Sequence, residues 1–119
     1  TSLKDQFNVF HGSYFLKNAI SFLNKNNQVG FSNFLSGYEY NPHNMFICKN
    51  SDILNQFYEE IFPWLFKCDE LFKKKNLTGY DKIRIYGFLA ERYMPYWFKN
   101  NFKTLNWPIT FFDTHKEIK

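Results

Sequence analysis

The stretch from residue 51 to 72 most constrains what this chain can fold into. Pro63 lies inside it, where a proline removes one backbone donor and its ring clashes with the carbonyl of Glu59. We therefore expect a long aromatic helix that is kinked at Pro63 or divided there into two abutting helices. The apolar side chains recur every three or four residues, as on one face of an α-helix; they are Leu54, Phe57, Tyr58, Ile61, Leu65, Cys68 and Phe72.

A second helix is predicted from about Asp81 to Lys99. At 100° per residue, Arg84, Glu91 and Pro95 fall on one side, and Gly87 borders that side. Arg84 and Glu91 are two turns apart, roughly 10 Å along the axis. A glycine within a helix costs on the order of 1 kcal/mol relative to alanine. Gly87 therefore indicates either a ligand or backbone approaching closely, or a tight helix crossing. The opposite side is apolar: Ile83, Tyr86, Leu89, Ala90, Tyr93 and Trp97.

The first forty residues predict shorter helical segments. Leu3, Phe7 and Phe10 fit a short amphipathic helix that Gly12 closes. Ser13 is the predicted N-cap of a second helix, which ends at 24–27. A short helical turn around 29–35, stopped by Ser36 and Gly37, then leads into an extended segment.

Two short apolar runs predict strands. The run 44–48 lies between turn residues, and the run 108–112 lies near the end of the chain. We expect them to pair. The predicted fold is α+β and mainly helical, with several helices packed on a minimal two-stranded sheet, as one domain over residues 1–119.

Composition excludes several classes of protein. The 119 residues and the hydrophobic fraction of 45% fit one domain with a real core. The net charge of +4 is modest, lysines are scattered apart from Lys73–Lys75, and aromatic residues are phased for burial, which argues against nucleic acid as a partner. The sequence contains no run of about eighteen apolar residues, so no membrane span is predicted. Cys48 and Cys68 lie in apolar segments without metal-ligand spacing, which indicates buried free thiols and a reducing compartment.

Several side chains are candidates for chemistry. Glu91 is suited to act as a general base, and Arg84 or Arg92 to bind phosphate or orient the carboxylate. The alternative is an ordinary ion pair on a solvated helix face. Asn44 either binds a sugar hydroxyl or caps a turn. Phe88 is either a platform for stacking a sugar ring or part of an interface with another domain.

Other common site patterns are missing from the sequence. His11, His43 and His115 have no metal-ligand spacing, so no metal site is predicted within the chain. Asp113 and His115 would need further carboxylates from elsewhere to bind a metal. Glycine-rich phosphate loops, nucleophile elbows and Cys/His dyads are absent. These residues alone are a poor candidate for a complete enzyme.

Two runs of the sequence resemble a known family. They are Asn44-Met45-Phe46-Ile47 and Arg84-x-x-Gly87-Phe88-Leu89-x-Glu91-Arg92, which flank the aromatic helix. The chain from about Asp5 to Phe112 resembles the C-terminal half of bacterial capsular and exopolysaccharide glycosyltransferases, a GT-A-like family long filed as a domain of unknown function. Further positions contribute to the resemblance: Asp5-Gln6-Phe7, His11, Tyr58, Trp64-Leu65-Phe66, Glu70, Leu105 and Pro108.

The resemblance implies transfer of a hexosyl group, most often galactose from UDP-galactose, to a growing capsular or lipopolysaccharide glycan. It places the nucleotide-binding sheet in an N-terminal half, so these residues would be the acceptor-side part, and the start at Thr1 fits a truncated chain. The implied cofactor is a divalent metal, Mn²⁺ or Mg²⁺, held mainly by the N-terminal half. The implied location is cytoplasmic, at the inner face of the membrane, with peripheral membrane contact.

The resemblance also assigns residues by position. Glu91 is the implied catalytic carboxylate, and Asn44, Arg84 and Arg92 are the implied substrate-binding residues, with His11 and His43 behind them. Phe88 is added to the substrate-binding residues as a candidate stacking platform. The alternative function is a non-catalytic module that contacts a protein or a glycan. In that case Arg84 and Glu91 form a plain ion pair.

Overall fold

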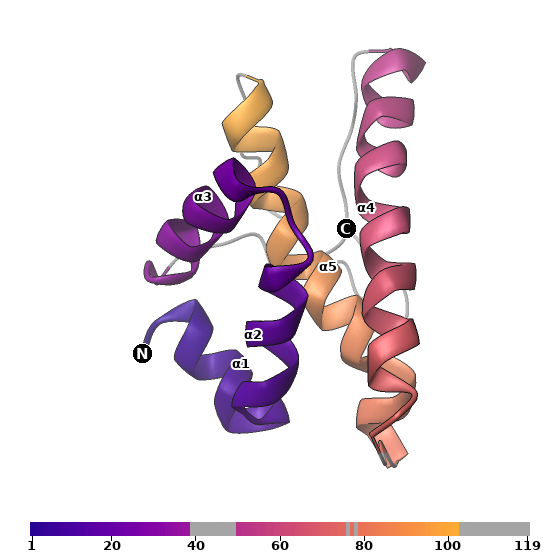
Figure 1. Cartoon of the computed structure of the whole chain (residues 1–119). Coiled ribbons are helices and arrows are strands. Elements are labelled where there is room, and N and C mark those ends of the chain that lie inside the picture. The colour runs from indigo at the N-terminus through magenta and orange to yellow at the C-terminus, as the bar shows by residue number, and fades with distance from the viewer. Residues whose placement is uncertain (39–49, 76, 78, 103–119) are drawn as a thin grey trace, which may run out of the picture.

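The computed structural model describes residues 1–38, 50–75, 77 and 79–102, without the side chains of 80–83. Figure 1 shows α5 running between the short N-terminal helices and α4. α5 packs against α1, α3 and α4, while α2 contacts α1, α3 and α4. The described elements are α1 (Leu3–His11), α2 (Ser13–Ser21), α3 (Lys25–Leu35), α4 (Ser51–Phe72) and α5 (Gly79–Asn101).

The prediction of helices packed on a two-stranded sheet is wrong. The described part of the chain folds into helices only, with no strand, so its class is all-helical rather than α+β. The segments 44–48 and 108–112, which we predicted as strands, lie outside the described residues. Hydrophobic periodicity alone does not distinguish a short buried strand from other buried segments. A sheet is also not needed here, because the amphipathic helices cover one another's apolar faces.

α4 runs through Pro63 as one helix of 22 residues, so the division into two helices is wrong. The side chain of Pro63 is exposed. The proline ring therefore lies on the solvent side of α4 rather than in the core. α4 begins at Ser51, as the sequence indicated. The side chain of Asn50 caps this end of the helix, because it accepts a hydrogen bond of 3.1 Å from the backbone N–H of Ile53.

The N-terminal helix boundaries follow capping chemistry. Gly12 closes α1 as predicted, with φ at +81° and its N–H donating to the carbonyl oxygen of Asn8. Gly12 is also the N-cap of α2, in place of Ser13, which is the first helical residue. Asn24 was expected to end the second helix. Instead its side chain caps α3, accepting a hydrogen bond of 2.9 Å from the N–H of Asn27.

The core lies where α4 and α5 meet the N-terminal helices. Leu89, Tyr93 and Trp97 are buried as predicted. Pro95, predicted on the polar side of α5, is buried too, because several helices surround the second half of α5. Buried Trp64 of α4 contacts both α5 and α2. Its ring lies 4.8 Å from that of Tyr93 on α5, and its indole N–H donates a hydrogen bond of 2.7 Å to the carbonyl oxygen of Ala19 on α2.

Candidate site between helices α1 and α5

A line of stacked side chains joins α1 to α5. On α1, the ring centres of Phe7 and His11 are 4.6 Å apart. His11 lies 4.8 Å from Phe88 of α5, and the guanidinium carbon of Arg84 lies 5.8 Å from the centre of the Phe88 ring. At the other end, the guanidinium carbon of Arg92 lies 5.1 Å from the Phe7 ring. We call these five residues the α1–α5 stack; it is an aromatic column with a cation at each end.

Helical spacing produces this arrangement. Phe7 and His11 are four residues apart on α1, and Arg84, Phe88 and Arg92 follow one another at intervals of four on α5. Side chains at positions i and i+4 of a helix are neighbours. Packing α1 against α5 therefore brings two such rows into contact. Four of these residues, all except Phe7, were predicted as site residues, but their contact with one another was not predicted.

Arg92 is buried, with only 4% of its surface exposed. One guanidinium nitrogen donates a hydrogen bond of 3.0 Å to the carbonyl oxygen of Phe88, and another donates 3.1 Å to the side-chain oxygen of Gln6. These contacts are made within the chain. His11 is also buried, at 9% exposed. The predicted roles of Arg92 and His11 in binding substrate stay predictions, since in this structure both side chains hold α1 against α5.

Arg84 and Glu91 lie on the same side of α5, and both side chains reach solvent. Arg84 is exposed and Glu91 is half-buried. A Cβ added to Gly87 would lie 3.7 Å from the Arg84 guanidinium, which is ordinary van der Waals contact. The described residues therefore give no steric reason for glycine at position 87, and the close-crossing interpretation gains no support. His43 and Asn44, the other predicted substrate-binding residues, lie outside the described residues.

Comparison with known proteins places the chain in a family. A family described as "Domain of unknown function (DUF4422)" matches residues 1–102, which include all five described helices and the α1–α5 stack. The chain belongs to the DUF4422 family. No curated protein and no solved structure gives a significant match. The family has no assigned activity in its description, so its name does not indicate what chemistry the chain performs.

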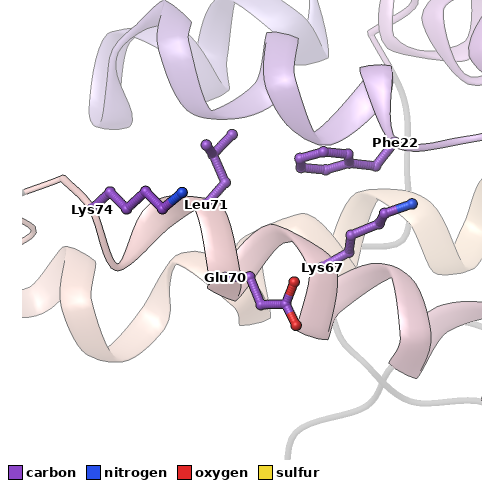
Figure 2. A pocket seen from close by; sticks show the side chains of 5 residues that line it. All are labelled: Phe22, Lys67, Glu70, Leu71 and Lys74. Atoms are coloured by element: carbon purple, nitrogen blue, oxygen red, sulfur yellow. The ribbon is translucent and has the colours of Figure 1, made fainter.

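A second feature of the DUF4422 chain is a pocket between α2 and α4. Its volume is about 200 Å³, and it is lined by Phe22, Lys67, Glu70, Leu71 and Lys74. Figure 2 shows the ring of Phe22, the residue that follows α2, lying over α4. The ammonium of Lys67 lies 5.7 Å from the centre of that ring. None of the residues predicted for the site lines this pocket. Its members lie in the last turns of α4 or directly after α2 and α4, and the sequence does not reveal these two helix ends as neighbours.

A hydrogen bond between Tyr86 and Asp69 connects α5 to α4, away from the α1–α5 stack. The Tyr86 hydroxyl donates a hydrogen bond of 2.6 Å to the Asp69 carboxylate, and Lys73 forms an ion pair with Asp69 at 3.2 Å. The hydrogen bond from Tyr86, followed by the effect of Lys73, lowers the pKa of Asp69 below its ordinary value of 3.8 although partial burial opposes this. Burial first, and the carboxylate second, raise the pKa of Tyr86 above its ordinary range. Tyr86 therefore stays a protonated donor.

The described cysteine is a structural thiol. Cys68 is fully buried and makes no disulfide, which confirms one of the two predicted free thiols; Cys48 lies outside the described residues. Burial raises the pKa of the Cys68 thiol to about 12. The thiolate is the nucleophilic form of cysteine. Cys68 is therefore not suited to nucleophilic catalysis at neutral pH.

The described residues do not fit a metal centre. In this part of the DUF4422 chain, no three His, Cys, Asp or Glu side chains gather closely enough to bind a metal ion. Mn²⁺ and Mg²⁺ prefer oxygen ligands, and Mg²⁺ is usually bound by one or two carboxylates together with waters and substrate phosphates. The described helices therefore offer no metal site built from protein ligands alone. Among the same residues, no helix has both the length and the apolar character to cross a membrane.

Proposed function

We propose that this DUF4422 chain is the acceptor-side part of a glycosyltransferase. The proposed reaction moves a hexosyl group, galactose in the first instance, from a nucleotide sugar to a bacterial capsular or lipopolysaccharide glycan. Two things support the proposal: the resemblance carried by the motif from Arg84 to Arg92, and the arrangement of that motif on α5. The observation that carries it is that Arg84, Phe88 and Glu91 share one helix face, with a cation and a carboxylate on either side of an aromatic ring.

The proposed chemistry uses the two polar ends of this face. The acceptor hydroxyl oxygen forms a bond to the anomeric carbon as the bond from that carbon to the diphosphate oxygen breaks. Glu91 accepts the proton of the acceptor hydroxyl as general base. Arg84 stabilises the negative charge that develops on the departing diphosphate. Arg84 and Glu91 are roughly 10 Å apart along the helix axis, so they serve opposite sides of the reacting carbon.

Phe88, His11 and Arg92 of the α1–α5 stack have a positioning role in this proposal. Phe88 contacts the Arg84 guanidinium on one side and His11 on another, and so restricts where that guanidinium lies. Arg92 fixes α1 through Gln6 and thereby fixes His11. A preorganised cation stabilises developing charge better than a mobile one. His43 and Asn44 keep their proposed contact with substrate on the strength of the resemblance alone.

Apart from the contact between Arg84 and the diphosphate, the binding sites for the nucleotide sugar and for any divalent cation are assigned to other parts of the protein. The described residues offer no group of three or more metal-binding side chains. The resemblance places the donor-binding half N-terminal to these residues. It also places the reaction at the cytoplasmic face of the membrane.

The test of this function is release of UDP by the full-length protein that carries these residues. We expect one UDP-sugar of a panel, UDP-galactose first, to release UDP in a manner that requires a bacterial glycan acceptor. Glycan binding without UDP release from any donor would contradict the proposal and favour the non-catalytic contact module. The exposed aromatic residues of α4 are the feature that would serve such a module.

A further inference from the structure

The pocket between α2 and α4 has an apolar middle and a lysine at each end. Phe22 and Leu71 supply the apolar surface. In Figure 2, Lys74 lies at one end of the pocket and Lys67 at the other, with Leu71 between them. The two lysines are seven residues apart, which separates their backbones by roughly 10 Å along a helix. A ligand in this pocket therefore meets a hydrophobic surface with a cation on either side.

The charges of these two lysines are not neutralised by the nearest carboxylate. Glu70 follows Lys67 by three residues and precedes Lys74 by four, which is the spacing at which ion pairs form on a helix. Within the described residues neither pair is formed, and Figure 2 shows the Glu70 carboxylate pointing away from the Phe22 ring. Lys73, in contrast, pairs with Asp69. The pocket thus keeps two ammonium groups for an anionic partner.

Aromatic rings at the two ends of α2 hold ammonium groups along the same seam. The Lys67 ammonium lies 5.7 Å from the centre of the Phe22 ring, and the Lys75 ammonium lies 4.3 Å from that of Tyr14. A cation over a ring is held from one side. The three N–H groups of an ammonium still allow it to donate to an acceptor on another side. The seam between α2 and α4 is therefore cationic along its length.

The size of the pocket favours a single ring as its ligand. Its volume of about 200 Å³ is below the roughly 300–1,000 Å³ of pockets that hold drug-sized ligands. A whole nucleotide belongs to that larger class, whereas one sugar ring is smaller. A sugar ring presents C–H groups that pack on Phe22 and Leu71, and its hydroxyl groups donate hydrogen bonds to carboxylates such as that of Glu70. A neutral sugar would leave both ammonium groups without an anion.

We propose that this pocket binds one sugar ring of an anionic glycan. The ring lies against Phe22 and Leu71, and anionic groups on that sugar and on the adjoining sugars bind Lys67 and Lys74. This inference stands apart from the proposed transfer reaction, because binding here needs neither a nucleotide sugar nor Glu91. Loss of glycan binding and loss of UDP release are therefore separate results.

Binding of trigalacturonate to the full-length protein, with no nucleotide sugar present, is the first test. Saturation-transfer NMR should detect binding of the acid, and its fully methyl-esterified form should bind at least about fivefold more weakly, because the ester has the same sugars without the charge. Added salt should weaken binding of the acid, since exposed charges are screened. Equal binding of acid and ester would overturn the proposal.

Variants place the binding in this pocket. The double variant Lys67→Gln, Lys74→Gln should raise the Kd for trigalacturonate about three- to tenfold. Lys73→Gln is the matched control and should leave the Kd unchanged, because the Lys73 ammonium pairs with Asp69 instead of lining the pocket. All three side chains are exposed, so the variants should keep the helical circular dichroism of the parent. An unchanged Kd in the double variant, or an equal loss in Lys73→Gln, would overturn the proposal.

Two other anions test whether the sugar ring matters. Citrate carries three carboxylates and no ring, and we expect it to bind more weakly than trigalacturonate. A thymidine trinucleotide combines negative charge with aromatic bases, and it should also bind more weakly because the pocket is too small for a nucleotide. Citrate that binds as well as trigalacturonate would indicate a plain anion site, and a trinucleotide that binds better would indicate a nucleic-acid site. Each of these results would overturn the proposal.

Discussion

The guanidinium of Arg92 on α5 donates a hydrogen bond of 3.1 Å to the side-chain oxygen of Gln6 on α1, although the two residues are 86 positions apart. The same guanidinium also contacts the ring of Phe7. A side chain that the resemblance assigned to substrate thus connects the two ends of the described chain. The packing of α1, and with it the position of His11 against Phe88, depends on this contact.

Replacing Arg92 should therefore destabilise the fold. Arg92→Met keeps most of the apolar stem but removes the hydrogen bonds to Gln6 and Phe88, and we expect the free energy of unfolding to fall by about 2 kcal/mol. Arg84→Met at an exposed position of the same helix should change it by less than about 0.5 kcal/mol. Urea unfolding of both variants gives the comparison. Equal stabilities would show that the buried contacts of Arg92 contribute nothing.

Gly30 on α3 should not tolerate alanine. A Cβ at position 30 would lie 2.5 Å from the Tyr96 hydroxyl oxygen, which in turn donates a hydrogen bond of 2.8 Å to Asn27. In an open helix, glycine to alanine stabilises by about 1 kcal/mol. Here we expect Gly30→Ala to destabilise by about 1–3 kcal/mol through overpacking. The cost should shrink when Tyr96→Phe removes the hydroxyl; a double-mutant cycle with no coupling would contradict the crowding.

Asp69 and Tyr86 should make stability depend on acid pH. The folded-state pKa of Asp69 lies below its ordinary value of 3.8, chiefly because of the hydrogen bond from Tyr86. A lowered pKa contributes stability that is present above pH 3.8 and is lost as pH falls through the folded-state value. Tyr86→Phe should therefore cost more stability at neutral pH than at a pH well below 3.8. A cost independent of pH would show that the carboxylate charge takes no part.

Cys68 should resist alkylation while the chain is folded. Its thiol is fully buried, and burial raises its pKa to about 12. Iodoacetamide at mildly alkaline pH should modify Cys68 slowly in buffer and completely in denaturant, because only the exposed thiolate reacts. Mass spectrometry of the peptide that contains Cys68 measures both rates. Similar rates in buffer and denaturant would contradict its burial.

Periodicity in the sequence predicted the two long helices well. The burial of Leu89, Tyr93 and Trp97 in α5 is confirmed. In α4 the predicted apolar face is confirmed for four residues, Phe57, Ile61, Cys68 and Phe72, and is wrong for Tyr58, which is exposed. Pro95 shows the limit of the method: a helical wheel divides a helix into two sides, but helices on several sides of α5 bury Pro95 as well. Likewise, a short apolar run carries too little periodicity to predict a strand, and the predicted sheet was wrong.

The sequence predicted which residues belong to the candidate site but not how they are arranged in space. The motif on α5 gave Arg84, Phe88, Glu91 and Arg92, but the sequence contains no signal that His11 of α1 lies against Phe88. Nor does it indicate that Arg92 is buried and Arg84 exposed, because burial depends on which helix covers which turn. The i, i+4 pairing of Phe7 with His11 was the one available hint of a shared face.

The most direct test of the account is glycosyl transfer by the full-length protein with Glu91→Gln. The amide keeps the size of the side chain but does not accept the acceptor proton, and a positioned general base contributes about 10²–10⁴-fold. We expect kcat to fall within that range while the melting temperature stays unchanged. Glu59→Gln, at an exposed carboxylate of α4, should keep full turnover. Full turnover in Glu91→Gln would contradict the assignment of Glu91 as the base.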